Sequence, residues 1–403
     1  MTRPIVPLLT VTCAVAVGNL YFPQALGPLI ATGLHVSPDA ATTVVTATQL
    51  GYTAGIVLLV PLADRLPNRP LLVALLGVSG LALLAAGCAP ALPALVAASA
   101  AVGLTTIAAQ VVGPLAAGLT APDRQGAVIG ILLSGSTAGM LLARTFGGAL
   151  GAWLGWQAPY LAAAAAALLL AAVLAKAVPT TTPSSRQPYP ALLLGPLLLL
   201  RREPELRRSS LYQATVFAGF SAVWTCLALL LTGPAYRLGA PAVGLLALVG
   251  AATVLCTPYA GRLVDRHGPD PVNLACLLGV LAAALVLLPG AGGGPLGLAA
   301  LVLGTLLLDV AMQCGMVASQ ARVYAVRPEA AGRLKTAYMT CAYLGGSAGS
   351  WLGVRVWDRA GWWGVCALLA ALAALALGRH LLAVRPSGPR PSTGDQPAGT
   401  VTR

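Results

Sequence analysis

Long apolar runs, separated by short segments that carry the charges, dominate this sequence. A helix needs roughly 20 mainly apolar residues to cross the hydrocarbon core of a bilayer. Only 9% of the 403 residues are charged, whereas a soluble domain carries about 25%, so most of the surface must face lipid. The sequence therefore predicts an all-α membrane protein with twelve transmembrane helices. The twelve runs cover residues 6–31, 41–62, 71–89, 92–118, 127–151, 158–178, 209–233, 241–262, 272–289, 295–321, 335–356 and 362–384.

The first run resembles a signal peptide, because it follows Arg3 near the N-terminus. A cleaved leader is usually shorter than this run and is not followed by many further spans. Eleven apolar runs follow here, so we expect the first run to be retained as a transmembrane helix.

Basic residues fall almost entirely on one side of the predicted membrane. With the N-terminus inside the cell, 20 of the 24 lysines and arginines lie in inner segments, whereas Arg237, Arg355 and Arg359 lie outside and Arg144 lies within a span. Lys and Arg concentrate in cytoplasmic loops, so both termini are predicted to be cytoplasmic. We expect a multi-pass protein of the bacterial plasma (inner) membrane. The same placement excludes nucleic-acid binding, because the bases do not line one polar face.

Patterns typical of enzymes and metal proteins are missing from the sequence. It contains no CxxC pair, no HExxH and no Gly-x-x-x-x-Gly-Lys nucleotide loop. Its eight cysteines lie in or beside apolar runs, where cysteine behaves as a small hydrophobe. An intramembrane enzyme would need paired acids or a Ser-Lys or His cluster within spans, and a sensor would need a substantial soluble domain. We therefore predict no enzymatic activity, no metal and no cofactor.

Composition also divides the chain into domains. Residues 1–178 and 209–384 hold six apolar runs each, and residues 179–208 between them are rich in Pro, Ser, Thr and Arg. Within this linker, Ala191–Leu200 is apolar but too short to span, and Gly195-Pro196 interrupts it, so we expect it to lie on the inner membrane surface. Residues 385–403 are rich in Pro, Gly and Ser and are expected to be disordered.

Short repeats indicate that the two halves arose by duplication. Gly261–Gly268 (GRLVDRHG) and Val60–Arg69 (VPLADRLPNR) both place Leu two residues before Asp-Arg, and the aspartates are 265 − 64 = 201 positions apart. Two further matches occur in the same order at similar offsets: residues 122–126 with 328–332, and residues 135–139 with 345–349. Two six-helix bundles of the same orientation are the parallel-repeat arrangement of one large class of secondary transporters.

With these repeats, the chain resembles the major facilitator superfamily over its full length. Gly261–Gly268 matches the family's loop motif after the second helix of each half, Gly-x-Leu-x-Asp-Arg-x-Gly; in the first copy, Val60, Pro67 and Asn68 depart from it. Other stretches resemble drug-efflux-like bacterial members of the YnfM type: TQLGY at 48–52, QVVGP at 110–114, ART at 143–145, VWT at 223–225, and Leu308-Asp309 with Gln313 and Gln320. The resemblance implies two pseudo-symmetric six-helix bundles, alternating access and a monomer.

The resemblance also implies that the loop motif forms a cytoplasmic gate that latches the inner side. An acid there can accept hydrogen bonds from the N-terminus of a neighbouring helix, and the arginines can pair with that acid or with lipid phosphate. Plain topology also explains the arginines, because inner loops are basic in any case. The gate candidates are Asp64, Arg65, Arg69, Gly261, Asp265, Arg266 and Gly268.

Two charged residues lie deep in predicted spans. Asp309 is fourteen residues beyond Pro295, about 21 Å along a helix, and it is the only carboxylate at such depth. Charge at the bilayer centre is expensive and usually functional, so Asp309 is the candidate proton-coupling group; a fixed structural carboxyl is the alternative. Arg144 is the only base deep in a span. Anion recognition, a gate and an ion pair with Asp309 remain open for it, and we favour a structural or gating role.

Uncharged polar residues in the apolar runs are candidates for the lining of a substrate cavity. The resemblance places helices one, four, seven and ten around that cavity, although interhelical hydrogen bonding explains each residue equally well. The candidates are Asn19, Tyr21, Gln24, Gln49, Tyr52, Gln110, Trp224, Gln313 and Gln320. The glycine pairs Gly135/Gly139 and Gly345/Gly349 have the spacing that lets helices approach closely, and we expect them to form shifting contacts between the halves.

Together these features predict a secondary active transporter of small organic molecules that works by alternating access. Proton-coupled efflux of a drug or metabolite, with protons exchanged at Asp309, is the favoured function. A sugar or metabolite transporter, exporting or importing without proton antiport, is the alternative. The predicted partners are a small-molecule substrate, protons and the lipid bilayer. Substrate, direction and coupling ion are left open by the sequence.

Overall fold

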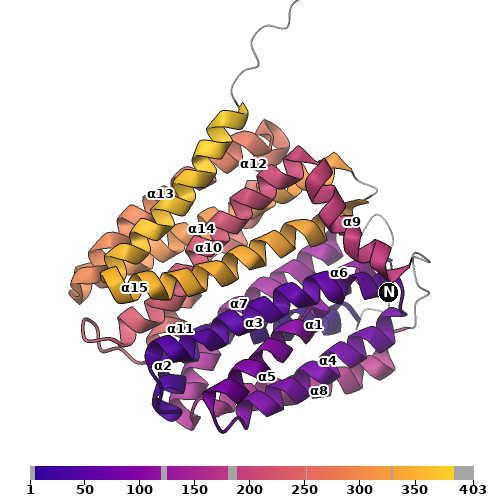
Figure 1. Ribbon diagram of the computed structural model, residues 1–403. Helices are drawn as coiled ribbons and strands as arrows, with labels where there is room; N and C mark the ends of the chain where they lie inside the picture. Colours follow the sequence, from indigo (N-terminus) through magenta and orange to yellow (C-terminus); the bar gives the residue numbers. More distant parts are fainter. Residues whose placement is uncertain (1–4, 119–124, 180–187, 251, 328–329, 385–403) are drawn as a thin grey trace, which may run out of the picture.

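A computed structural model describes residues 5–118, 125–179, 188–250, 252–327 and 330–384. The elements in these ranges are helical (Figure 1). The first half contains α1 (Ile5–Tyr21), α2 (Pro23–Gly33), α3 (Pro38–Leu58), η1 (Val60–Asp64), α4 (Asn68–Gly87), α5 (Leu92–Thr105), α6 (Ala108–Gly118), α7 (Gln125–Leu154) and α8 (Gln157–Ala177). The remainder contains α9 (Tyr189–Arg202), α10 (Pro204–Thr232), α11 (Ala240–Val249), α12 (Ala252–His267), α13 (Pro269–Leu287), η3 (Leu288–Gly292), α14 (Gly294–Val326) and α15 (Ala331–Val384).

Each predicted run falls on one helix or on consecutive helices. Within the described residues, eight helices are long and apolar enough to cross a membrane, or nine if the bent pair α1 and α2 forms one span. That pair bends by 45° where Pro23 follows Phe22, because proline supplies no backbone N–H and its ring crowds the preceding turn. α15 holds the last two predicted runs and breaks at Gly361, where φ is 57°; Figure 1 shows the chain turning there between orange and yellow.

The two copies of the loop motif have different backbones for a local reason. In the second copy, Gly268 separates α12 from α13 with φ 80° and ψ 171°, a conformation that residues with a Cβ rarely adopt. In the first copy, Pro67 occupies the equivalent position with φ −58°, because its ring fixes that angle. The first copy instead leaves α3 through the tight turns of η1.

Glycines let two pairs of helices approach closely, and the two pairs correspond through the repeat. A Cβ at Gly139 on α7 would lie 2.1 Å from the carbonyl oxygen of Ala14 on α1. A Cβ at Gly349 on α15 would lie 2.0 Å from the carbonyl oxygen of Ala218 on α10. Both contacts lie within a half, so the expectation that these glycines join the two halves is wrong. They instead hold the first predicted span of each half against the fifth predicted span of the same half.

The two halves meet along other helices. In Figure 1, α1–α8 lie in the lower part of the molecule, and α10, α13, α14 and α15 lie in the upper part. α3 packs against α15, α7 packs against α11, and α2 packs against α10. At the α7–α11 contact, the Thr145 hydroxyl donates to the carbonyl oxygen of Gly244 at 2.7 Å. A Cβ at Gly244 would lie 2.6 Å from the Thr145 Cα, so the backbones touch at the end predicted to face outside.

The described part of the linker contains α9 and the first turn of α10. α9 continues through Pro196, so the expected interruption at Gly195-Pro196 is wrong. α9 contacts both halves: the Tyr189 hydroxyl donates to the carbonyl oxygen of Leu58, and Glu203, just after α9, pairs with Arg327 at 2.8 Å. Residues 180–187 and the tail 385–403 lie outside the described residues.

Candidate functional site

Asp309, Trp224 and Arg144 meet in the middle of the molecule, each from a different helix. The indole Nε1 of Trp224 on α10 donates to Oδ1 of Asp309 on α14 at 3.1 Å. The guanidinium carbon of Arg144 on α7 lies 4.2 Å from the centre of the Trp224 ring. Arg144 and Trp224 are fully buried, and Asp309 is 4% exposed. Because α7 belongs to the first half and α10 and α14 to the second, this cluster joins the two halves.

The indole of Trp224 therefore lies between the two buried charges. The described salt bridges include none between Arg144 and Asp309, so a direct ion pair within 4 Å is not formed in this conformation. A cation over an aromatic face is attracted by the negative face of the ring, and the indole N–H stabilises the carboxylate as a hydrogen-bond donor. Trp224 thus stabilises both charges at once.

Arg144 is enclosed by aromatic rings and one amide. Its Nε donates to Oε1 of Gln24 at 3.0 Å. Its guanidinium carbon lies 5.0 Å from the ring centre of Tyr21 and 5.5 Å from that of Phe220. Both terminal nitrogens of Arg144 are buried without a hydrogen-bond partner. Of the sequence candidates, Tyr21, Gln24 and Trp224 therefore belong to this cluster, and Phe220 was missed because nothing in a phenylalanine within an apolar run marks it.

A second group of polar side chains joins α3, α10 and α15. Nε2 of Gln49 donates to the Ser221 hydroxyl at 2.9 Å, and the hydroxyls of Ser221 and Ser350 lie 2.7 Å apart. All three side chains are buried. The sequence analysis found Gln49 but missed both serines, whose only signal was a hydroxyl inside an apolar run. This group is a hydrogen-bonded contact between the halves.

Tyr52 and Gln110 form a third polar contact. Nε2 of Gln110 donates to the Tyr52 hydroxyl at 3.0 Å, and the Tyr52 ring packs edge-on against Tyr343 with 4.5 Å between ring centres. Tyr343 in turn packs on Phe217, 5.1 Å away, and Phe217 stacks on Phe220. A row of aromatic rings thus connects this contact with the rings around Arg144.

The remaining cavity candidates lie elsewhere. Asn19 is buried and lines a crevice of about 280 Å³ between α1, α7 and α8, and its amide nitrogen has no hydrogen-bond partner. Gln313 and Gln320 are half-buried on α14. The structure therefore brings six of the nine candidates into the contacts around Asp309, Gln49 and Tyr52, and leaves three apart.

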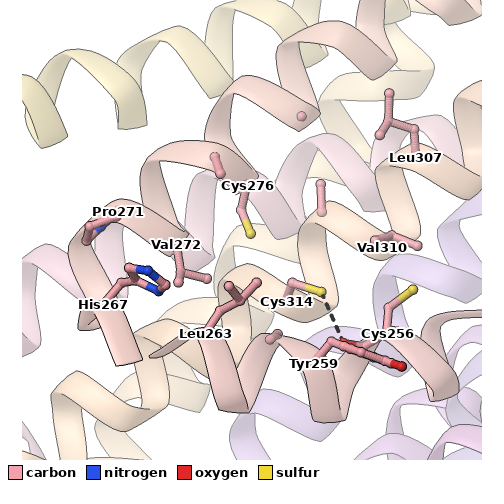
Figure 2. Close-up of a pocket in the computed structure, with 14 residues that line it drawn as sticks. Cys256, Tyr259, Leu263, His267, Pro271, Val272, Cys276, Leu307, Val310 and Cys314 are labelled. Carbon is pink, nitrogen blue, oxygen red and sulfur yellow. Dashed lines mark hydrogen bonds between the residues drawn. The ribbon is translucent and has the colours of Figure 1, made fainter. Parts of the chain in front are cut away.

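A separate apolar crevice of about 480 Å³ lies between α12, α13 and α14. Figure 2 shows Cys256, Cys276 and Cys314 around it, with Tyr259 and His267 toward the α12 side. No Asp, Glu, Lys or Arg lines this crevice, and none of the nine cavity candidates lies in it. It is therefore distinct from the charged cluster.

The first copy of the gate motif is held by its last basic residue. Arg69 at the start of α4 donates through Nη2 to the carbonyl oxygen of Ala175 on α8, which ties the motif to the end of the sixth predicted span. Arg65 is exposed. Asp64 ends η1, but its side chain lies outside the described residues.

The second copy is exposed, and a neighbouring acid forms the charge cluster of that region. The side chains of Asp265 and Arg266 point to solvent, and Gly261 lies on α12 with no atom within 4 Å of an added Cβ. Asp270, at the start of α13, instead pairs with Arg322 at 2.5 Å and with Arg208.

Asp270 was not among the residues predicted from the sequence. Its only signal was a carboxylate in the first turn of a helix, close after the motif. Both of its arginine partners are only 6% exposed, and both also pair with Glu205, so Asp270 and Glu205 together compensate two buried charges. Among the described residues, no three His, Cys, Asp or Glu side chains gather closely enough to hold a metal ion.

Comparison with known proteins decides the family. The model of the Major Facilitator Superfamily matches residues 8–350. The chain belongs to this superfamily. Its fold is therefore the superfamily's two bundles of transmembrane helices, and the chain is a multi-pass membrane transporter rather than an enzyme.

Relatives and a solved structure agree with this assignment. The uncharacterized transporter YgaY of Escherichia coli O157:H7 is 33% identical over 380 residues, covering 93% of this chain and 95% of YgaY. The chloramphenicol resistance protein of Streptomyces lividans is 30% identical over 284 residues, covering 68% of this chain and 70% of that protein. The crystal structure of the nucleoside transporter NupG superposes with a TM-score of 0.77 at 13% identity, covering 94% of this chain and 99% of NupG.

Proposed function

We propose that this superfamily member exports small organic molecules in exchange for protons. The observation that supports this most is the buried carboxylate of Asp309, bound to Trp224 where the two halves meet. Burying a charge is costly, and protonation removes that cost. Ionised Asp309 therefore disfavours conformations that bury it, and protonation makes those conformations more stable relative to conformations that expose it.

The exchange has two steps at this carboxylate. Substrate binds from inside while Asp309 is ionised and held by the Trp224 indole. After the halves have tilted, a proton from outside neutralises Asp309, and the substrate loses its partner and leaves. The protonated form returns and releases its proton inside before the next substrate binds. A lower pH outside therefore drives efflux. The similarity to a chloramphenicol resistance protein supports the outward direction.

The contacts between the halves supply the surfaces that must separate during this cycle. Thr145 on α7 and Gly244 on α11 are joined by one hydrogen bond, and Gln49 is joined to Ser221 by another. When the halves separate, these polar groups can form hydrogen bonds with water instead, and the original hydrogen bonds form again when the halves return. We propose that the Thr145–Gly244 contact closes the outer side, with both termini in the cytoplasm, and that the protein functions as a monomer in the bacterial inner membrane.

The experiment that tests proton exchange compares Asp309→Asn with wild-type protein. A growth screen in a bacterial host without its own pumps first identifies a compound against which the chain protects. Everted membrane vesicles then measure transport of that compound with and without an imposed proton gradient. We expect Asp309→Asn to abolish gradient-driven transport and to weaken substrate binding, because the uncharged amide resembles the protonated carboxyl from which the substrate leaves. Asp358→Asn, a change of an exposed carboxylate on α15, is the matched control and should transport normally.

One result would overturn the coupling role. If Asp309→Asn transported at the wild-type rate, and a protonophore still abolished that transport, the proton would bind elsewhere. If wild-type transport ignored the proton gradient altogether, the alternative function would hold: export or uptake of a sugar or metabolite without proton antiport. The hydrogen-bonding group of Gln49, Tyr52 and Gln110 favours that alternative, because amides and hydroxyls suit polyhydroxylated substrates.

A further inference from the structure

The two terminal nitrogens of Arg144 lack hydrogen-bond acceptors. A guanidinium has five N–H donors and no acceptor. Only its Nε is bonded, to Gln24, while Nη1 and Nη2 are buried without a partner. Leaving a buried charged donor unsatisfied costs more than an ordinary lost hydrogen bond, so an arginine is kept in such a place for a purpose other than stability.

A neighbouring donor is also unpaired. Gln24 gives its Oε1 to Arg144, and its amide nitrogen Nε2 is buried without a partner. The rings of Tyr21, Phe220 and Trp224 around the guanidinium offer π faces but no carboxylate. Three donor nitrogens on two bonded side chains therefore lack an acceptor. A planar group with two acceptor oxygens matches the fork of Nη1 and Nη2.

The charges of the site restrict the rest of the ligand. Arg144 and Asp309 together are neutral, and both are buried. A ligand with a net negative charge would leave one buried charge uncompensated, which costs several kcal/mol. A ligand with a carboxylate for Arg144 and a basic group for Asp309 leaves the site neutral. Protonation of Asp309 then removes the partner of the basic group, as the exchange requires.

We propose that Arg144 binds the carboxylate of the substrate, and that the substrate is a small zwitterion whose basic group faces Asp309. This proposal rests on the proposed function for the role of Asp309. The indole of Trp224 separates the two charges of the site, so the substrate bridges them across one ring. The three rings around Arg144 favour a ligand with an apolar or aromatic body.

A binding experiment in detergent tests the proposal without any gradient. The probes are matched triplets built on alanine, leucine and phenylalanine: the free amino acid, its cationic amide and its anionic N-acetyl derivative. Calorimetry on the purified full-length chain at neutral pH measures each affinity. We expect at least one zwitterion to bind roughly tenfold or more tightly than its amide and its N-acetyl derivative.

Two variants assign that preference to Arg144. Arg144→Gln should reduce zwitterion affinity roughly tenfold or more and make the amide equal to the free amino acid. Gln24→Glu keeps the arginine but supplies an internal carboxylate; it should block zwitterion binding and leave the cationic amide as the preferred ligand. Arg355→Gln removes an exposed arginine that also lies over an indole, 4.1 Å from the Trp351 ring centre, and should change neither the zwitterion affinity nor the amide affinity.

Each other outcome overturns the proposal. No zwitterion preference in any triplet, or a preference that survives both Arg144→Gln and Gln24→Glu, would show that Arg144 does not hold a carboxylate. Tighter binding of the N-acetyl derivatives would show that the ligand is a net anion. Failure of proton exchange in vesicles would remove the proposed function but leave an Arg144-dependent zwitterion preference intact, so the two failures are distinguishable.

Discussion

Replacing Trp224 with phenylalanine tests the link between the indole and proton exchange. The Trp224→Phe variant keeps an aromatic ring beneath Arg144 but removes the N–H that donates to Asp309 at 3.1 Å. That bond stabilises the ionised carboxylate more than the protonated one, because a charged acceptor makes the stronger hydrogen bond. Without it, Asp309 holds a proton more tightly, so exchange should respond at a higher outside pH than in the wild-type protein.

The size of the shift follows from the geometry. A hydrogen bond to a charged group contributes about 1.5–3 kcal/mol net, and about 1.4 kcal/mol corresponds to one pH unit. The observed donor–acceptor distance is at the long end of the normal N–H···O range. We therefore expect the outside pH of half-maximal efflux to rise by about one unit.

The assay is efflux from vesicles at fixed inside pH over a series of outside pH values, with the compound found in the growth screen. Trp362→Phe is the matched control, because Trp362 is also buried and its Nε1 donates to the backbone carbonyl of Leu287 at 2.7 Å. Both variants lose one indole hydrogen bond, and only Trp224→Phe should move the midpoint. An unchanged midpoint in Trp224→Phe with full transport activity would refute the argument that the indole tunes Asp309.

Two further predictions concern stability, measured as melting temperature in detergent. Gly349→Val should prevent normal packing of α15 on α10, because its Cβ would lie 2.0 Å from the Ala218 carbonyl oxygen. Gly77→Ala on α4, where an added Cβ would have nothing within 4 Å, should be neutral or stabilising by about 1 kcal/mol. Equal melting temperatures of the two variants would contradict the close helix contact. Asp270→Asn should destabilise the protein by about 1.5–3 kcal/mol, because two buried arginines then keep only Glu205 as an acidic partner. Asp265→Asn changes an exposed side chain and should stay within about 0.5 kcal/mol of wild type. The reverse order would show that the motif acid stabilises this conformation.

The apolar runs, the repeat and the motif were sufficient to predict the fold class. Their information is local: a run of about 20 apolar residues predicts a span whatever it packs against. At Gly268, for example, the motif requires a glycine, and the residue has the positive φ that glycine adopts readily. At Pro67, where the first copy departs from the motif, the backbone differs, and the structure contains η1 just before that position.

The sequence also identified the deep charges but not the arrangement between them. Depth along a span predicted Asp309 and Arg144 separately, because charge is rare in apolar runs. That the indole of Trp224 lies between them depends on how α7, α10 and α14 are rotated about their axes, which hydrophobicity does not report. The same reason explains the missed serines: Gln49 contacts Ser350, 301 positions away in the chain.

Two misjudged features show where local patterns were insufficient. The spacing of Gly345 and Gly349 showed that some helix packs closely there, but only the tertiary structure decided that it is α10 of the same half. The motif made Asp265 the expected acid of its loop, whereas packing places Asp270 against two arginines. By itself, the sequence determined which segments enter the membrane and which charges they carry, because transfer into lipid depends on each segment alone. The tertiary structure decided which side chains meet and left two nitrogens of Arg144 without a partner, because those contacts depend on the relative rotation and register of segments far apart in the chain.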